Sequence, residues 1–158
     1  MDDRLILRLE LEDLNAAYAA ALDDGELERW PELFVADGVY RVVPRDNFER
    51  GLPLAVMRCE SRGMLEDRVA ALRRASVYAP RAMRHLISSV RLVRVDGAVL
   101  HAAASYAVLQ TLPDQLTSVF NAGRYLDEVV RQDGVLRFRQ RIAVFDSVLV
   151  PGSLVYPI

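Results

Sequence analysis

The pattern of apolar and polar residues predicts a helix near the start of the chain. Acidic residues fill the positions around an apolar face that has helical spacing. The residues of this face are Leu7, Leu11, Leu14, Tyr18 and Ala21. Asp23-Asp24-Gly25 ends this helix, and a shorter helical stretch runs from Leu27 through Trp30 to Phe34. The chain therefore opens with two helices.

A short strand and an irregular stretch are expected next. Asp37-Gly38 turns the chain into a strand over residues 39–43, and residues 44–51 have the composition of a loop. Residues 52–58 are predicted as a strand or an extended edge. This part of the chain links the first helices to a third helix.

The third helix is predicted from about residue 62 to residue 77. Ser61 is suited to cap its first turn, and Pro80 stands just beyond its end. Its apolar stripe consists of Met64, Leu65, Val69 and Leu72.

The second half of the chain reads as strands. Asp96-Gly97 and Asp133-Gly134 each separate two β-rich runs, and such steps favour tight hairpin turns. Pro113-Asp114 supplies a further turn. The predicted strands cover residues 84–95, 98–111, 116–131 and 135–148. Helices followed by a meander predict an α+β fold, a curved antiparallel sheet with about three helices on its concave face.

Length and charge narrow the class of protein. The chain has 158 residues, which is typical of a single domain over residues 1–158. A net charge of -2 argues against nucleic-acid binding. An acidic start and the lack of a long apolar run argue against a secretory signal or a membrane helix. A single cysteine, Cys59, allows no internal disulfide and suits a reducing cytoplasm.

The sequence lacks the side chains that would hold a redox-active metal centre. A Rieske cluster needs two cysteines and two histidines, whereas the chain has one cysteine. An oxygenase iron needs two histidines and a carboxylate on one face. The Asp96-Gly97 turn should place His85 opposite Val108 and His101 opposite Leu92, about nine residues or ~30 Å apart. We therefore expect no cofactor and no metal in this chain.

Charged residues in the predicted strands are candidates for a subunit interface. Arg137, Arg139 and Arg141 alternate along the last strand and should share one face, either solvated or in contact with an acidic partner. The opposite face would carry the apolar residues Leu136, Phe138, Ile142 and Val144. Asp127 and Asp146 sit in strands where aspartate is disfavoured, so ion pairs are expected, with Arg124 close to the first. Arg84 and His85 complete the candidates, and His85 could instead be a general base.

Several short motifs resemble a known family when taken in order. Residues 30–40 are similar to the junction of helix and first strand in the nuclear transport factor 2-like superfamily. The other motifs are Tyr40-Arg41-Val42, Asp46-Asn47, and residues 64–73, 84–87, 123–127 and 139–147. Together they resemble the small (beta) subunits of Rieske-type aromatic-ring-hydroxylating dioxygenases. Those of terephthalate dioxygenases are most similar, followed by those of salicylate hydroxylases.

The resemblance implies a cone-shaped fold and a structural role. In this family the small subunits form a trimer that carries three large subunits in a hexamer. The large subunit holds the Rieske [2Fe–2S] cluster and the mononuclear iron, and a reductase passes electrons from NADH. The chain would then be a non-catalytic subunit in aromatic-compound catabolism, with no catalytic residue of its own.

Two other functions stay open from the sequence. Asp37 and Tyr18 resemble acid–base positions of superfamily enzymes, so the chain could be a stand-alone isomerase, dehydratase or polyketide cyclase that uses Asp37, Tyr18 or His85. A turn at Asp37 and a core position for Tyr18 explain the same pattern. A homo-oligomeric binding module is the third possibility. A deep cavity lined by these three residues would favour the enzyme.

Overall fold

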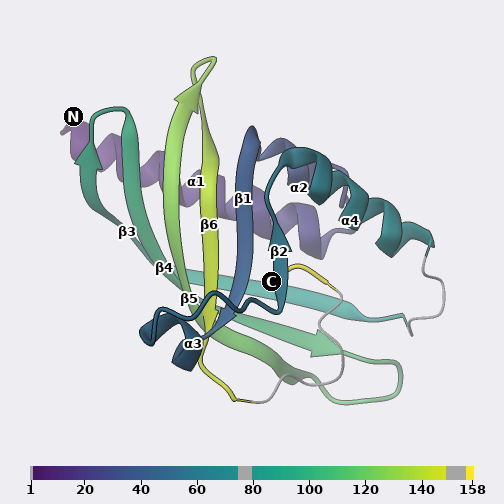
Figure 1. Cartoon of the computed structure of the whole chain (residues 1–158). Helices are drawn as coiled ribbons and strands as arrows, with labels where there is room; N and C mark the ends of the chain where they lie inside the picture. The colour runs from purple at the N-terminus through teal and green to yellow at the C-terminus, as the bar shows by residue number, and fades with distance from the viewer. Residues whose placement is uncertain (1, 75–79, 149–155) are drawn as a thin grey trace.

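The computed structural model describes residues 2–74, 80–148 and 156–158. A six-stranded curved sheet with the strand order β2-β1-β6-β5-β4-β3 is packed against helices (Figure 1). The helices are α1 (Asp3–Asp23), α2 (Arg29–Glu32), α3 (Arg45–Glu49) and α4 (Arg62–Arg74). The strands are β1 (Phe34–Pro44), β2 (Met57–Cys59), β3 (Ala82–Asp96), β4 (Val99–Thr111), β5 (Ser118–Gln132) and β6 (Val135–Phe145). The predicted α+β class is confirmed.

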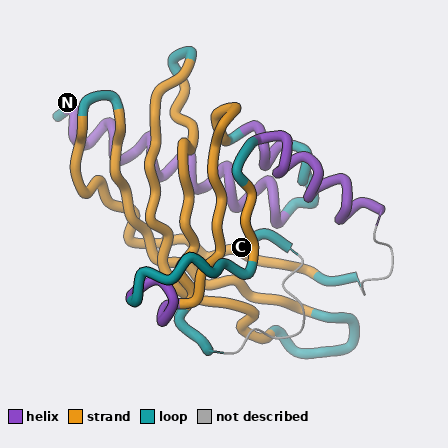
Figure 2. Tube along the Cα trace, in the orientation of Figure 1, coloured by secondary structure: helices purple, strands orange, loops and turns teal. Residues whose placement is uncertain are grey.

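The long helix α1 spans the concave face of the sheet. Asp2 caps it by accepting a hydrogen bond from the backbone N–H of Arg4 at 3.0 Å. The predicted stripe is buried from Leu11 to Ala21, with Leu11 and Tyr18 fully enclosed, and Leu7 is partly buried. Figure 2 shows α1, α2 and α4 on one side of the strands, and the lower halves of β3 to β5 bend to form the cone. The apolar stripe therefore determines which face of α1 meets the sheet.

The strands β3 to β6 form the predicted antiparallel meander. Asp133 and Gly134 both have positive φ, 52° and 79°, as a tight turn of this type requires. At the first hairpin only Gly97 does, with a φ of 57°. Both Asp-Gly turns therefore lie where the sequence placed them.

One strand pairing differs from the expected antiparallel sheet. β1 pairs with β6 in parallel, with Tyr40 opposite Arg141. Hairpin turns specify pairs that are adjacent in sequence, whereas β1 and β6 are brought together by the core that they share. The short strand β2 pairs with the other side of β1 at the edge of the sheet and overlaps only the end of the segment predicted over residues 52–58. The helix α3 lies in the segment that was predicted as a loop.

A β-bulge in β6 overturns the predicted row of arginines. Glu128 on β5 pairs with Gln140, but Val129 pairs with Phe138, so Arg139 is an extra residue. Beyond this point, the β6 side chains face the opposite side of the sheet from the one that strict alternation predicts. Arg141 therefore faces the core with Phe138, while Arg139 is exposed on the outer face.

The outer face of the sheet carries a second, smaller apolar cluster. Ile142 and Val144 pack there with Val43, and Phe48 of α3 packs against them. These two β6 residues were predicted to share a face with Leu136 and Phe138, which belong instead to the main core. The same bulge accounts for this error.

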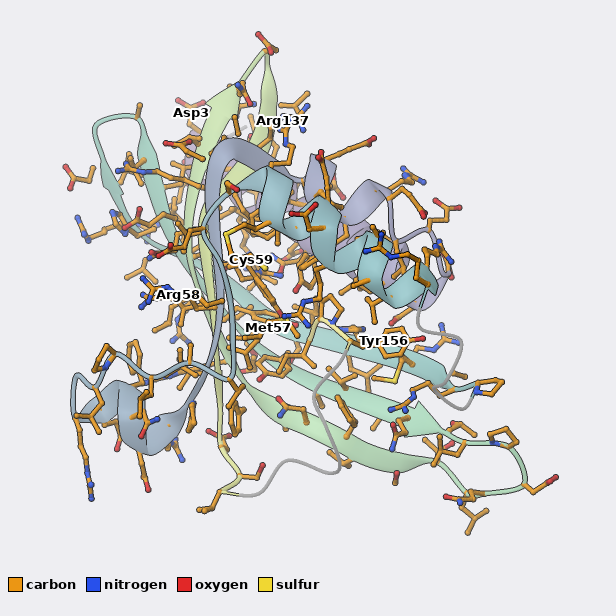
Figure 3. The ribbon with its side chains drawn as sticks, turned by 45° about the vertical axis from the view of Figure 1, so that its right-hand side comes forward. Asp3, Met57, Arg58, Cys59, Arg137 and Tyr156 are labelled. Atoms are coloured by element: carbon orange, nitrogen blue, oxygen red, sulfur yellow. The ribbon has the colours of Figure 1, made fainter. Side chains whose placement is uncertain are left out.

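The third predicted helix is α4, which begins at Arg62 as expected. Ser61 accepts a hydrogen bond from the backbone N–H of Met64 at 3.2 Å. The helix is described to Arg74, and the rest of the predicted span lies outside the described residues. Met57 and Cys59 of β2 point inward and Arg58 points outward (Figure 3).

Candidate functional site

A buried ion pair occupies the interior of the cone. Arg141 is fully buried, and its Nε and Nη2 donate to the two carboxylate oxygens of Asp127 at 2.9 and 2.8 Å. Nη2 also donates to Oδ1 of Asn15 on α1 at 2.6 Å. These contacts join β5, β6 and α1 through one guanidinium group. Asp127 was expected in an ion pair, but its partner is Arg141 rather than Arg124.

Three aromatic rings surround the guanidinium group. Its central carbon lies 3.8 Å from the ring centroid of Tyr125, 4.1 Å from that of Phe138 and 4.3 Å from that of Tyr18. Cations are attracted to the faces of such rings, most strongly where water is excluded. The rings therefore stabilise a charge that would be costly to bury alone.

Burial shifts the pKa values of the ionisable groups inside the cone. It raises the pKa of the Asp127 carboxyl, and the charge of Arg141 opposes this shift. Burial also disfavours the charged form of Arg141, but the Asp127 carboxylate outweighs it, so the pKa of Arg141 is raised. Desolvation raises the pKa of Tyr18, Tyr40 and Tyr125. The three phenols therefore stay neutral, and the hydroxyls of Tyr18 and Tyr40 are hydrogen-bonded.

Ile158 fills the space beside these tyrosines. Its carbonyl oxygen accepts hydrogen bonds from the hydroxyls of Tyr18 at 2.6 Å and Tyr40 at 2.8 Å. Its backbone N–H donates to the Tyr40 hydroxyl at 2.9 Å, and the residue is fully buried. The Tyr18 hydroxyl is therefore engaged by the protein itself.

His85 and Asp23 form a second buried pair nearby. Nδ1 of His85 lies 2.6 Å from Oδ1 of Asp23, and the backbone N–H of His85 donates to Oδ2 at 2.8 Å. The side chains are 1% and 7% exposed. The His85 ring meets the Tyr18 ring edge-on, with 6.2 Å between the centroids. Asp23 lies in the segment that the sequence marked only as a helix end.

Asp37 does not join the other two candidate acid–base residues. It lies in β1 between Phe34 and Val39, where the pairing with β6 is interrupted, and it is exposed. Tyr18 and His85 are brought together in the core. Within the described part of the chain, the three residues therefore line no common cavity, which removes the arrangement that would have favoured a stand-alone enzyme.

The remaining interface candidates lie at or near the surface. Arg84 is exposed, and Arg124 lies over the Phe48 ring at 5.5 Å. Arg139 is 3.7 Å from Glu128, and Asp146 is 3.6 Å from Arg45. Arg137 donates to the backbone carbonyl of Glu32. Arg141, Asp127 and His85 are buried within the chain and can contact no partner directly.

The two histidines lie on different parts of the sheet. His85 pairs with Val108 as expected, but His101 pairs with Arg94 rather than Leu92, because β3 has irregularities between Ser88 and Arg94. Along β4 the histidines are about seven residues apart, ~23 Å, rather than the expected nine residues. Within the described ranges, no group of three histidine, cysteine or acidic side chains is placed to hold a metal ion.

Cys59 lies on β2 and is buried. Burial raises the pKa of its thiol, which the charge of Arg68 only partly offsets. The thiolate is the reactive form of cysteine, so this thiol is poorly suited to nucleophilic chemistry.

Besides Asp23 and Ile158, sequence reasoning gave no role to Asn15, Tyr40 and Tyr125. Asn15 occupies a buried position on α1 beside the apolar stripe, and a polar residue at such a position signals a hydrogen-bonded network. Tyr40 and Tyr125 stood in the quoted motifs without a role. Residues 123–127 provide the inward side chains Tyr125 and Asp127, so this motif is now explained by the core.

Comparisons with known proteins identify the family to which this fold belongs. The SnoaL-like domain family matches residues 3–142. The chain is 36% identical to the anthranilate 1,2-dioxygenase small subunit of Burkholderia cepacia, over 94% of this chain and 92% of that protein. It is 34% identical to a terephthalate 1,2-dioxygenase beta subunit of Comamonas sp, over 98% of this chain and 100% of that protein.

A solved structure is similar over nearly the whole chain. It comes from Novosphingobium aromaticivorans and is described as the beta subunit of an aromatic-ring-hydroxylating dioxygenase. Its TM-score is 0.89 and its identity 42%, with 98% of each chain covered. The chain is thus a SnoaL-like domain of the nuclear transport factor 2-like fold. Within that class, it belongs to the small subunits of aromatic-ring-hydroxylating dioxygenases.

Proposed function

We propose that this chain is the non-catalytic small subunit of an aromatic-ring-hydroxylating dioxygenase. The observation that carries this function is the similarity to such subunits over nearly the full length of both chains. The interior supports it, because Arg141, its aromatic neighbours and Ile158 occupy the centre of the cone. The chain serves as a rigid body that supports a catalytic partner.

The partner is a large subunit that carries the redox centres. It would hold the Rieske [2Fe–2S] cluster and the mononuclear iron, and electrons would come from NADH through a reductase. This chain has a single cysteine and cannot hold a Rieske cluster. No helix among the described residues is long and apolar enough to cross a membrane. A cytoplasmic complex accords with the single, reduced cysteine.

The assembly that we propose is a trimer of this chain carrying three large subunits, a hetero-hexamer. The outer face of the sheet offers contact surface, since Arg84, Leu86 and Arg139 are exposed there. Arginine and apolar side chains are common in subunit contacts. Cyclic closure would satisfy every copy of a head-to-tail surface at once.

Co-expression with the matching large subunit tests the proposal. The two chains should co-purify as a hexamer, and iron should follow the large subunit. Aromatic-acid turnover with NADH and reductase should need both chains. Turnover or stoichiometric iron with this chain alone would overturn the proposal, and so would failure of the two chains to associate.

A charge reversal on the outer face tests the trimer. Arg139→Glu should weaken self-association, measured by light scattering at micromolar concentration. Arg29→Glu is the control, because Arg29 is exposed on α2, away from the sheet. Arg141→Glu cannot serve here, because it would place an acid in the core. A trimer unchanged by Arg139→Glu would remove this residue from the interface.

A further inference from the structure

A groove runs between α1 and β3, outside the filled centre of the cone. Its volume is about 410 Å³, within the range of small-molecule sites. The helix provides small side chains, Ala16 and Ala19, and β3 provides Ile87 and Val90. Ser88 and Ser89 lie at a bulge of β3, where Ser89 has a φ of 54°. The groove therefore has apolar walls with a few hydroxyl groups.

His85 provides one buried polar atom in the groove lining. Its Nε2 has no hydrogen-bond partner among the described residues, although the side chain is only 1% exposed. The Asp23 carboxylate can only accept, so Nδ1 carries a proton, and the neutral form of the ring then has its lone pair on Nε2. Buried polar atoms are nearly always hydrogen-bonded, so an unpaired acceptor here points to a ligand.

The geometry places Nε2 toward the groove. The two nitrogens of an imidazole point to nearly opposite sides of the ring. Nδ1 points to Asp23, at the C-terminal end of α1, whereas the groove residues Ala16 and Ala19 lie one to two turns earlier on that helix. The free nitrogen therefore lies on the side of the ring where the groove begins.

The charges of the groove cancel. Arg8 and Glu12 line its rim and form an ion pair with 3.0 Å between Nε and Oε1. The Asn15 side chain is already hydrogen-bonded, since it accepts from Arg141 and donates to the carbonyl of Leu11. An ionic ligand would meet no unpaired opposite charge in this lining. The best ligand is neutral, mostly apolar and able to donate one hydrogen bond.

We propose that this groove binds a small phenol, with the phenolic hydroxyl donating to Nε2 of His85. The ring lies between Ala19 of α1 and Ile87 of β3. Asp23 is a positioning residue, because its bond to Nδ1 fixes the tautomer and the orientation of the imidazole. The site concerns binding only and needs no contact with the large subunit.

The test uses phenol and the full chain labelled with nitrogen-15 at histidine. The chain has two histidines, so His101 on β4 is an internal control in every spectrum. Phenol should shift the ring nitrogens of His85 in a saturable way and leave those of His101 in place. Toluene, which has the ring without the hydroxyl, should bind about tenfold more weakly.

A variant that fills the groove completes the test and leaves the pair of His85 and Asp23 unchanged. Ala19→Leu should weaken phenol binding at least tenfold, whereas Ala20→Leu, at an exposed position on the same helix, should leave it unchanged. Equal shifts of both histidines would overturn the proposal. So would the absence of a shift at saturating phenol, or wild-type binding by Ala19→Leu.

Discussion

Arg141 shows how one residue can be misplaced by a correct local rule. Alternation along a strand puts residues 137, 139 and 141 on one face, and this holds until an extra residue enters the strand. The bulge at Arg139 moves Arg141 into the core, where Asp127, Asn15 and three rings surround it. The acid at position 127 was recognised as unusual, but its partner depends on strand register, which the sequence does not show.

Removing the Asp127 carboxylate should strongly destabilise the protein. Asp127→Ala leaves the Arg141 guanidinium buried without its counter-ion, and such changes cost about 3–5 kcal/mol. The free energy of unfolding in urea measures this loss. Arg139→Ala is the matched control on β6 and should change stability by less than about 0.5 kcal/mol, since Arg139 is exposed.

Replacing both partners should recover much of that loss. Arg141→Met combined with Asp127→Leu removes both charges, and apolar replacements of buried ion pairs are often neutral. If the double variant were no more stable than Asp127→Ala, the aromatic contacts of the guanidinium group would outweigh the cost of burying its charge.

Gly123 is required by close packing of β5 against β6. A Cβ at this position would lie 2.0 Å from the carbonyl oxygen of Val144 and 2.8 Å from Cα of Phe145. Gly123→Ala should therefore destabilise the fold by more than about 1–3 kcal/mol, the usual cost of overpacking. Gly63→Ala in α4 is the control, because its nearest neighbour would be 3.7 Å away. Equal melting temperatures for the two variants would contradict this account.

At the scale of elements, the spacing of apolar residues and the turn residues were sufficient to predict most of the helices and strands. The stripe of α1, the cap of α4 and both Asp-Gly hairpins lie where the sequence placed them. The parallel pairing of β1 with β6 could not be predicted from the sequence, since no turn links these strands. The pairing of His101 was also missed, because bulges in β3 shift the register.

The helix α4 is tied to the start of α2 by an acid whose pKa is lowered. Nε of Arg73 donates to Glu28 at 2.8 Å, and this bond lowers the pKa of Glu28 from 4.5 to about 2. A lowered pKa in the folded state means that the bond stabilises fully above pH 4.5 and is lost as the pH falls to about 2. Acid should therefore loosen this end of α4.

Carbon-13 NMR of the Glu28 carboxyl measures this titration. The midpoint should lie near 2 in the wild type and return towards 4.5 in Arg73→Gln. The melting temperature of Glu28→Gln should also depend less on pH in this window. A wild-type midpoint close to 4.5 would show that the ion pair does not persist in solution.

At the scale of the whole molecule, the cone is filled where related folds could hold a substrate. The resemblance of the motifs predicted the architecture and the family, and both are confirmed. The three candidate acid–base residues do not form one site. Asp37 lies on the surface, and the Tyr18 hydroxyl is hydrogen-bonded to Ile158. The pairing of His85 with Asp23 required tertiary contact between α1 and β3, which no local pattern reports.

Turnover of the reconstituted complex should follow assembly rather than any side chain of this subunit. Asp37→Asn should leave turnover and hexamer content unchanged, because the residue is exposed and away from the core. Asp127→Ala should lower both in proportion, because it weakens the fold that the large subunit contacts. Loss of a general base would instead lower the rate about 10²–10⁴-fold with the fold intact. Turnover divided by hexamer content, measured with the melting temperature, separates these cases. A hundredfold fall in that ratio for Asp37→Asn, at an unchanged melting temperature, would assign chemistry to this subunit and reject the structural role.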